Sequence, residues 1–296
     1  MTTKVLSRSP LLPGLYAKAA AAAVPGAARL PCVGAPTGRG ESLPDLTLRL
    51  PHVTIDSGRV ARYRDVCGFS GEEHVPATYL HVLAFPLQLA LMTDPSFPFT
   101  AMGLVHIGNT ITQHRQLTSA DEPTITVAAE GLQPHPRGRQ VTLVSTAEVA
   151  GATVWRDETV LLSRGRSDDS VHAAGAALPA EAPAGAQVWR LPGGLGRRYA
   201  AVSGDRNPIH LYDVTAKAFG FKRHIVHGMW TKARALAELE RHLPEEFTVS
   251  VAFKKPIWLP GQARFGVRRD GNGRTDFGVT SLDGDRTHLL GRVTVA

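Results

Sequence analysis

The sequence predicts an α+β protein built from two related halves, and three observations support this prediction. An apolar segment at residues 77–92 has leucines at helical spacing, and four strand-like runs follow it. The same order, a helix and then a run of strands, recurs within residues 186–296. Between the two, residues 166–185 contain almost no large apolar side chain, which is typical of a linker. The chain therefore reads as an internal duplication.

The boundaries follow from changes in composition along the chain. Residues 1–51 are rich in Ala, Pro and Gly and predict an N-terminal arm with one short helix. Residues 52–165 form the first repeat, 166–185 the linker and 186–296 the second repeat. The expected helices cover residues 62–66, 77–92, 195–203 and 228–242, with a kink or early break at Pro86. The expected strands cover residues 101–113, 124–132, 140–149, 154–163, 248–258, 262–269, 275–281 and 287–295.

Composition excludes several classes of protein. Hydrophobic residues make up 43% and charged residues 20% of the 296 positions, which is typical of a globular chain. The formal net charge of +7 comes mainly from scattered Arg and favours an anionic ligand or partner. No nucleic-acid-binding motif accompanies it, so we expect no nucleic acid. Cys32 and Cys67 are too few for a disulfide framework and lack metal-ligand spacing.

The sequence also bears on location. No stretch is long and apolar enough to span a bilayer, and the alanine run near the N-terminus is too weakly apolar for a signal peptide. We expect a cytoplasmic protein. Peripheral association with a membrane through an amphipathic helix at residues 11–23 is the alternative.

The strongest functional signal lies in residues 199–230. Asp205, Asn207 and His210 fall within six residues, and Gly204 and Pro208 predict a turn or irregular loop there. An Asp and a His at this spacing can place both side chains on one wall of a cleft and polarise a water molecule.

Gly228 stands at the expected start of the helix at 228–242. Its free backbone N–H and its lack of a side chain would suit an enolate oxygen, which needs a donor already in place.

Each of these residues also has an ordinary structural interpretation. Asp205 is a candidate turn or cap residue, and His210 a candidate core histidine with satisfied hydrogen bonds. Asn207 is expected to support the loop under either interpretation. His224 and His227 flank the helix start, and we interpret them as cap or packing residues rather than catalysts.

A comparison of the two halves separates the loop from the fold. Residues 62–69 align with 198–205, and Arg, Tyr, Val and Gly match at a constant offset. Phe69 stands where the second half has Asp205, and the segment that would hold Asn207 and His210 is missing from the first half. We therefore expect one reactive loop per chain, in the second half.

These residues carry a resemblance to a known family. Residues 199–210, followed by Ala216, Gly220-Phe221 and 225–229, resemble the hydratase-2 signature of the MaoC-like (R)-specific enoyl-thioester hydratases and dehydratases. Residues 253–261 also look like the core strand of that family. The whole chain is similar to its long two-repeat type. The resemblance implies a double hot-dog fold, in which each repeat wraps an antiparallel sheet around a long helix and the two join as a pseudo-dimer.

The resemblance also implies roles for individual residues. Asp205 and His210 would be the catalytic pair, Gly228 the oxyanion donor, and Asn207 would orient the loop. Ser203 and Tyr199 belong to the same signature and are assigned to orienting the site. Candidate substrate contacts are Lys254, Lys255 and Arg198 for anionic groups, and Phe69 and Tyr79 for the acyl chain, with plain core packing equally open for the aromatic pair.

The implied activity is reversible hydration of trans-2-enoyl thioesters to (3R)-3-hydroxyacyl thioesters in fatty-acid metabolism. It implies no metal and no redox cofactor. The expected partner is an acyl-CoA or acyl-carrier-protein thioester, and further pairing into a homodimer of pseudo-dimers stays open.

Two alternatives belong to other classes. One is a non-catalytic acyl-thioester binder or scaffold subunit. The other is an acyl-CoA thioesterase, which would need a different acid on the helix, and Glu238 lies well beyond the helix start.

Overall fold

The computed structural model describes residues 2–23, 42–166, 170, 177–271 and 273–295. The chain divides into two units that exchange segments. Unit 1 comprises Met1–Thr54, His81–Ile107 and Asp121–Gly175, and unit 2 comprises Ile55–Leu80, Gly108–Ala120 and Ala176–Ala296. Helix α3 (Ala77–Met92) and strand β3 (Leu104–Gln113) therefore each contribute residues to both units.

Unit 1 is a sheet with a helix held against it. The strand order is β1-β2-β4-β5-β6, with β1 and β2 parallel and the other neighbours antiparallel. On α3, Gln88 donates from Nε2 to Ser145 Oγ in β5 (2.9 Å), and His81 Nδ1 lies 3.1 Å from Asp157 Oδ2 in β6. The elements are β1 (Thr2–Val5), α1 (Leu12–Ala23), β2 (Leu46–Leu50), η2 (Ala101–Gly103), β4 (Thr124–His135), β5 (Gly138–Val149) and β6 (Ala152–Arg164).

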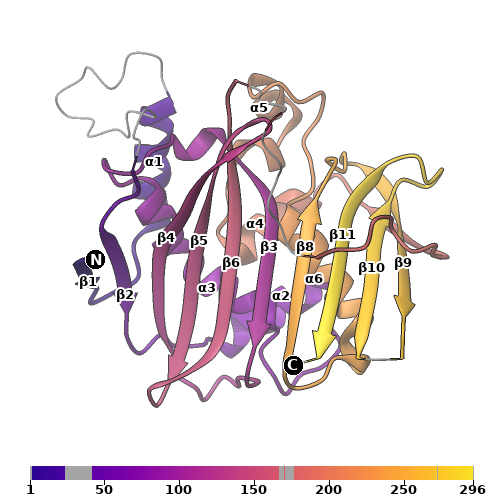
Figure 1. Cartoon of the computed structure of the whole chain (residues 1–296), viewed down its shortest axis with the longest axis horizontal. Helices are drawn as coiled ribbons and strands as arrows, with labels where there is room; N and C mark the ends of the chain where they lie inside the picture. The colour runs from indigo at the N-terminus through magenta and orange to yellow at the C-terminus, as the bar shows by residue number, and fades with distance from the viewer. Residues whose placement is uncertain (1, 24–41, 167–169, 171–176, 272, 296) are drawn as a thin grey trace. The chain divides into compact units, whose positions relative to one another are not determined.

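Unit 2 contains the loop singled out by the sequence. Its sheet has the order β3-β8-β11-β10-β9-β7, antiparallel throughout, and helix α6 lies against it (Figure 1). The helical elements are α2 (Ser57–Cys67), α4 (Leu195–Ser203), η3 (Pro208–His210), α5 (Asp213–Ala218), α6 (Gly228–Leu239) and η4 (Glu240–His242). The strands, besides the end of β3, are β7 (Gln187–Leu191), β8 (Phe247–Phe253), β9 (Gly261–Arg269), β10 (Arg274–Thr280) and β11 (Thr287–Val295).

Two polar contacts fix α6 on the unit 2 sheet. The fully buried Lys232 donates from Nζ to the Val249 carbonyl of β8 (3.1 Å). Trp189 of the edge strand β7 donates from Nε1 to Glu238 Oε1 (3.0 Å), near the other end of the helix. A helix wrapped by an antiparallel sheet is the hot-dog arrangement, so the predicted α+β fold class is confirmed.

Most predicted elements are present, but the early break at Pro86, the alternative to a kink there, and the strand end at residue 258 are wrong. Helix α3 continues through Pro86 to Met92, because its flanking residues, among them Leu87, are buried and hold the helix despite one missing N–H. Strand β8 ends at Phe253 rather than at residue 258, since Pro256 has no N–H to donate to a ladder. Strands β1, β2 and β7 and helix α5 were not predicted.

Two helices that the sequence comparison aligns between the halves have similar ends. Helices α2 and α4 both stop at a glycine with left-handed backbone, Gly68 (φ 84°) and Gly204 (φ 77°). Each glycine N–H donates to the carbonyl four residues earlier, a helix end that favours glycine because it has no Cβ. These two glycines are aligned in the sequence comparison of the halves.

The remaining sequence expectations concern the chain ends and the connection. The helix expected in the arm at residues 11–23 is present as α1. Much of the predicted linker (residues 167–169 and 171–176), and residues 24–41 of the arm, lie outside the described residues. Within the described ranges, no helix has the length and apolar composition needed to cross a membrane.

Candidate active site

A short set of local hydrogen bonds shapes the loop after α4. The left-handed Gly204 ends the helix, and the next amide, of Asp205, donates to Ser203 Oγ (3.2 Å). Asn207 donates its backbone N–H to Asp205 Oδ1 (3.1 Å), and its side-chain oxygen accepts the N–H of Ile209 (3.4 Å). These Asx-type bonds hold the Asp205 carboxylate in one orientation, with its side chain 31% exposed.

His210 is buried, and one of its ring nitrogens has no hydrogen-bond partner among the residues that the structure describes. Its Nδ1 donates to the Ile225 carbonyl (2.8 Å), which leaves the lone pair on Nε2. Burial lowers the pKa of His210, although the charge of Asp205 and the Ile225 carbonyl act in the opposite direction. The ring is therefore neutral near pH 7 and can accept a proton.

His227 connects the loop to the start of α6. Its ring stacks on His210 with centroids 3.8 Å apart and 24° between the planes, and its Nε2 donates to the Asp205 carbonyl (3.0 Å). Its Nδ1 is buried without a hydrogen-bond partner among the described residues. Burial, and then the proximity of His210, lower the pKa of His227 to about 3, so the ring stays uncharged.

The sequence interpretation of His227 as a cap or packing residue was therefore incomplete. The residue occupies the N-cap position of α6 but makes no side-chain cap bond, and it contacts both Asp205 and His210. The signal that could have identified it was its place directly before Gly228 in the motif.

Gly228 is the first residue of α6. First-turn amides of a helix have no intrahelical acceptor, and His227 does not cap them. A Cβ on Gly228 would lie 3.0 Å from the Phe253 ring, so a side chain has little room there. The helix start thus offers backbone donors and a close approach, beside the stacked histidines.

An aromatic cluster in unit 2 extends from His227. Tyr199 lies 4.8 Å from His227 and 6.1 Å from Tyr63, between ring centroids. Tyr63 in turn contacts Tyr79 (5.2 Å) and Phe69 (6.4 Å). Burial raises the pKa of Tyr199 well above its usual value, so its hydroxyl stays protonated. The structure therefore brings three sequence-predicted residues, Tyr199, Phe69 and Tyr79, into one cluster beside the loop.

The predicted cationic residues have different surroundings. Arg198 is exposed and its Nη2 lies 3.1 Å from Asp65 Oδ2 of α2. Lys254 and Lys255 are exposed and directly precede a segment whose Ile257 carbonyl accepts the Val226 N–H (2.9 Å). The lysines thus lie just before the segment that pairs with the backbone preceding His227, whereas Arg198 already has an acidic partner.

Comparison with known proteins shows the family of this chain. A model of the MaoC like domain matches residues 196–279, which include the loop and all of α6. The 3-hydroxyacyl-thioester dehydratase X of Mycobacterium tuberculosis is 37% identical over 260 residues, covering 86% of this chain and 91% of the relative. The chain belongs to the MaoC-like dehydratase family. The family predicted from the sequence is thereby confirmed.

Solved structures place the fold of this MaoC-like dehydratase in the same group. The crystal structure of HtdX from Mycobacterium tuberculosis has a TM-score of 0.74 at 36% identity, covering 84% of this chain and 100% of that one. A MaoC-like dehydratase from Phytophthora capsici has a TM-score of 0.70 at 16% identity, covering 86% and 96%. At that identity the second likeness concerns the fold alone.

The loop of this MaoC-like dehydratase also contains a group with metal-ligand chemistry. Asp205, His210 and His227 each offer a ligand atom, and these atoms lie within 4.8 Å of one another. Imidazole lone pairs lie in the ring plane, and two rings stacked at 24° direct them almost parallel. Nearly parallel lone pairs are poorly placed to converge on one ion, so the stacking of the two rings does not favour a preformed metal site.

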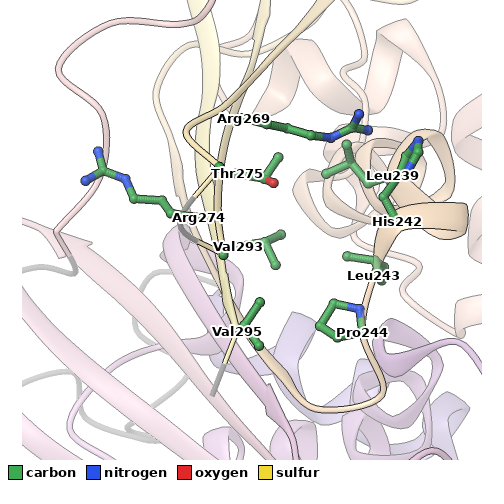
Figure 2. Close-up of a pocket in the computed structure, with 11 residues that line it drawn as sticks. Leu239, His242, Leu243, Pro244, Arg269, Arg274, Thr275, Val293 and Val295 are labelled. Atoms are coloured by element: carbon green, nitrogen blue, oxygen red, sulfur yellow. The ribbon is translucent and has the colours of Figure 1, made fainter.

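A pocket elsewhere in unit 2 lies apart from this loop. It has a volume of ≈ 170 Å³, and Leu239 and Leu243 face Val293 and Val295 across it (Figure 2). It lies at the C-terminal end of α6, whereas Gly228 begins that helix, and eleven rises along a helix amount to about 16 Å. No residue predicted for the active site of the MaoC-like dehydratase lines it.

Proposed function

We propose that this hydro-lyase interconverts trans-2-enoyl and (3R)-3-hydroxyacyl thioesters. One observation carries the proposal: His227 bonds to the Asp205 carbonyl, stacks on the neutral His210 and directly precedes the start of α6. The relative's name, 3-hydroxyacyl-thioester dehydratase, supports the substrate class.

In the hydration direction, the free Nε2 of His210 takes a proton from a water molecule while the water oxygen bonds to C3. The Asp205 carboxylate accepts a hydrogen bond from the other O–H of that water, which stays on the oxygen, and so fixes its orientation. The electron pair of the C2–C3 double bond moves toward the thioester carbonyl, and the Gly228 N–H stabilises the resulting enolate oxygen. One such donor is worth about 3 kcal/mol of barrier. The enolate then collapses as the acidic form of the Asp205 and His210 pair delivers a proton to C2.

The remaining predicted contacts complete the proposal. Lys254 and Lys255 would bind the phosphates of the thioester carrier, because both are exposed just before the segment paired with residue 226. Arg198 is the weaker candidate because it pairs with Asp65. Phe69 and Tyr79 would flank the acyl chain. Cytoplasmic location and a homodimer of the chain belong to the same proposal, and sedimentation would test the latter.

The thioesterase alternative loses its candidate acid. Glu238 accepts a hydrogen bond from Trp189 and forms an ion pair with Arg234, and its side chain is 15% exposed. The carboxylate therefore holds α6 to β7 and is not free to act on a substrate. The non-catalytic alternative gives no reason for a buried neutral histidine with a free Nε2 beside an oriented carboxylate.

The decisive assay supplies a trans-2-enoyl-CoA series and follows the loss of enoyl absorbance and the release of free thiol. We expect absorbance loss without thiol release, and a product of (3R) configuration. Asp205→Asn and His210→Ala should each lower kcat by at least about 100-fold, since each removes a group that handles the proton.

The matched control variants are Asp285→Asn and His242→Ala, an exposed aspartate on a turn and a histidine at the separate pocket. Both should keep wild-type rates. Full activity in Asp205→Asn or His210→Ala would disprove the site, and thiol release that needs Glu238 would favour the thioesterase.

A further inference from the structure

The insertion that carries the catalytic loop also carries an unusual outer surface on α5. Tyr212, Val214 and Phe219 are 54%, 80% and 39% exposed. They are three of the nine exposed large hydrophobic residues found among the described residues, and they fall within eight positions. Scattered exposed hydrophobics are ordinary in proteins, but a concentration of this kind marks an interaction surface. We call Tyr212, Val214, Lys217, Ala218 and Phe219 the α5 face.

The inner side of α5 is anchored, so the exposure of the α5 face is a stable feature. Ala216 is fully buried, and Thr215 donates from Oγ1 to the Pro208 carbonyl (2.7 Å). Asp213 accepts the backbone N–H of His224 (3.0 Å) and contacts its ring at Nδ1 (2.5 Å).

The exposed residues of α5 are spaced so that they share one side of the helix. Val214, Lys217 and Ala218 are three and four residues apart, which places them on one side of the helix, and all three are exposed.

Positive charge surrounds this apolar surface. The Arg197 guanidinium lies 4.9 Å from the centroid of the Tyr212 ring and donates to the Leu211 carbonyl (2.9 Å). Between residues 206 and 223 the one acidic residue of the sequence is Asp213, which His224 already engages. The exposed basic residues of this stretch are Arg206, Lys217, Lys222 and Arg223.

We propose that the α5 face docks an acidic carrier protein that bears the acyl thioester. This inference rests on the proposed function and adds the form in which the substrate arrives. An apolar centre with a charged rim is the anatomy of a protein interface. The phosphates of free coenzyme A would bind to cations alone, and Val214 and Phe219 would remain in water. A carrier protein covers the apolar centre and meets the basic rim with its own acidic residues.

The location of the α5 face supports this choice of partner. Helix α5 follows the catalytic loop directly, and η3, which ends at His210, packs against it through the bond between Thr215 and Pro208. A carrier docked on α5 would thus hold its prosthetic arm close to the loop.

The experiment compares one enoyl group on coenzyme A with the same group on a purified acyl carrier protein. The test variant carries Val214→Ser and Lys217→Glu. The matched control carries Val188→Ser and Arg190→Glu, an exposed valine and an exposed arginine on the edge strand β7. We expect the test variant to lose about tenfold or more in kcat/KM on the carrier substrate only, and the wild-type preference for the carrier to weaken as salt is added.

Each outcome has a separate meaning. If the ratio of kcat/KM on the carrier-protein substrate to kcat/KM on the coenzyme A substrate is the same in the test and control variants, the docking surface is overturned and the hydratase activity is not. Tight binding of the wild type to anionic vesicles, abolished in the test variant while carrier kinetics stay unchanged, would assign the α5 face to a lipid surface and overturn the proposal. Absence of hydration on both substrates would contradict the proposed function itself.

Discussion

The rings of His210 and His227 are stacked with centroids 3.8 Å apart, and this contact joins the proposed base to the residue that precedes the helix start. The second ring also donates a hydrogen bond to the Asp205 carbonyl. His227 therefore holds Asp205 and His210, the proposed catalytic pair, in position relative to the α6 amides.

Replacement of His227 should separate positioning from chemistry. Glutamine can keep a donor near the position of Nε2, so His227→Gln should retain most of the activity. His227→Leu removes the hydrogen bond to the loop and should lower kcat by about 10- to 100-fold with little change in KM, because small misplacements of catalytic groups have effects of that size. Steady-state kinetics of the two variants check this. Equal losses in both would show that the donor is irrelevant.

Gly228→Ala tests the close approach at the helix start. The added Cβ would meet the Phe253 ring at 3.0 Å, so we expect a loss of about 1 kcal/mol in stability together with reduced kcat/KM. Adding Phe253→Leu makes space and should restore the melting temperature. If the thioester must approach Gly228, activity stays low in this double variant, whereas recovery of both properties would limit the role of Gly228 to packing.

The pH dependence of kcat/KM follows from His210. Burial lowers the pKa of His210 from its usual 6.5, so the acidic limb of the profile should lie below pH 6.5. The charge of Asp205 raises the same pKa, so the residual activity of Asp205→Asn should show its acidic limb at a lower pH still. If the acidic limb of the Asp205→Asn profile instead shifts to a higher pH, the assignment of His210 as the base is contradicted.

Stability should fall in acid because of His227. The pKa of His227 is lowered from 6.5 to about 3 in the folded protein. The unfolded chain therefore binds a proton at His227 below pH 6.5 while the folded protein does not, so the unfolding free energy falls as the pH drops from 6.5 toward 3. One such group contributes a slope of about 1.4 kcal/mol per pH unit. Between pH 7 and pH 5, His227→Gln should therefore lose about 2 kcal/mol less unfolding free energy than the wild type. Denaturant titrations at both pH values measure it, and parallel losses would refute it.

Lys232 provides a prediction for the core of unit 2. Its fully buried Nζ donates to the Val249 carbonyl and to both oxygens of Asn109. Lys232→Met keeps the apolar stem but removes the charged donor from buried acceptors, so we expect a loss of about 2–4 kcal/mol in unfolding free energy. The exposed Lys217→Met is the control and should change stability by less than about 0.5 kcal/mol. Similar values for the two variants would contradict the prediction.

Local pattern accounts for the parts that could be predicted from the sequence. The sequence located α3 and α4 to the residue, and Gly204 marked the end of α4. Helix α2 begins at Ser57, before the segment predicted at residues 62–66. Strands β1 and β7 escaped prediction because edge segments with few buried residues carry little periodic signal. The roles assigned to Asp205, His210 and Gly228, the orienting residues and the four-segment division of the chain stay predictions for the experiments above.

The sequence by itself determined the family, the fold class and the residues of the loop, since these depend on neighbours within a few positions and on a motif with fixed spacing. Only the tertiary structure decided that His227 stacks on His210, that Lys232 is buried between β3 and β8, and that Arg198 pairs with Asp65. Each of these contacts joins segments that are distant in the chain or lie on different elements. Their formation depends on burial and on the approach of separate backbones, which periodicity along one segment does not encode.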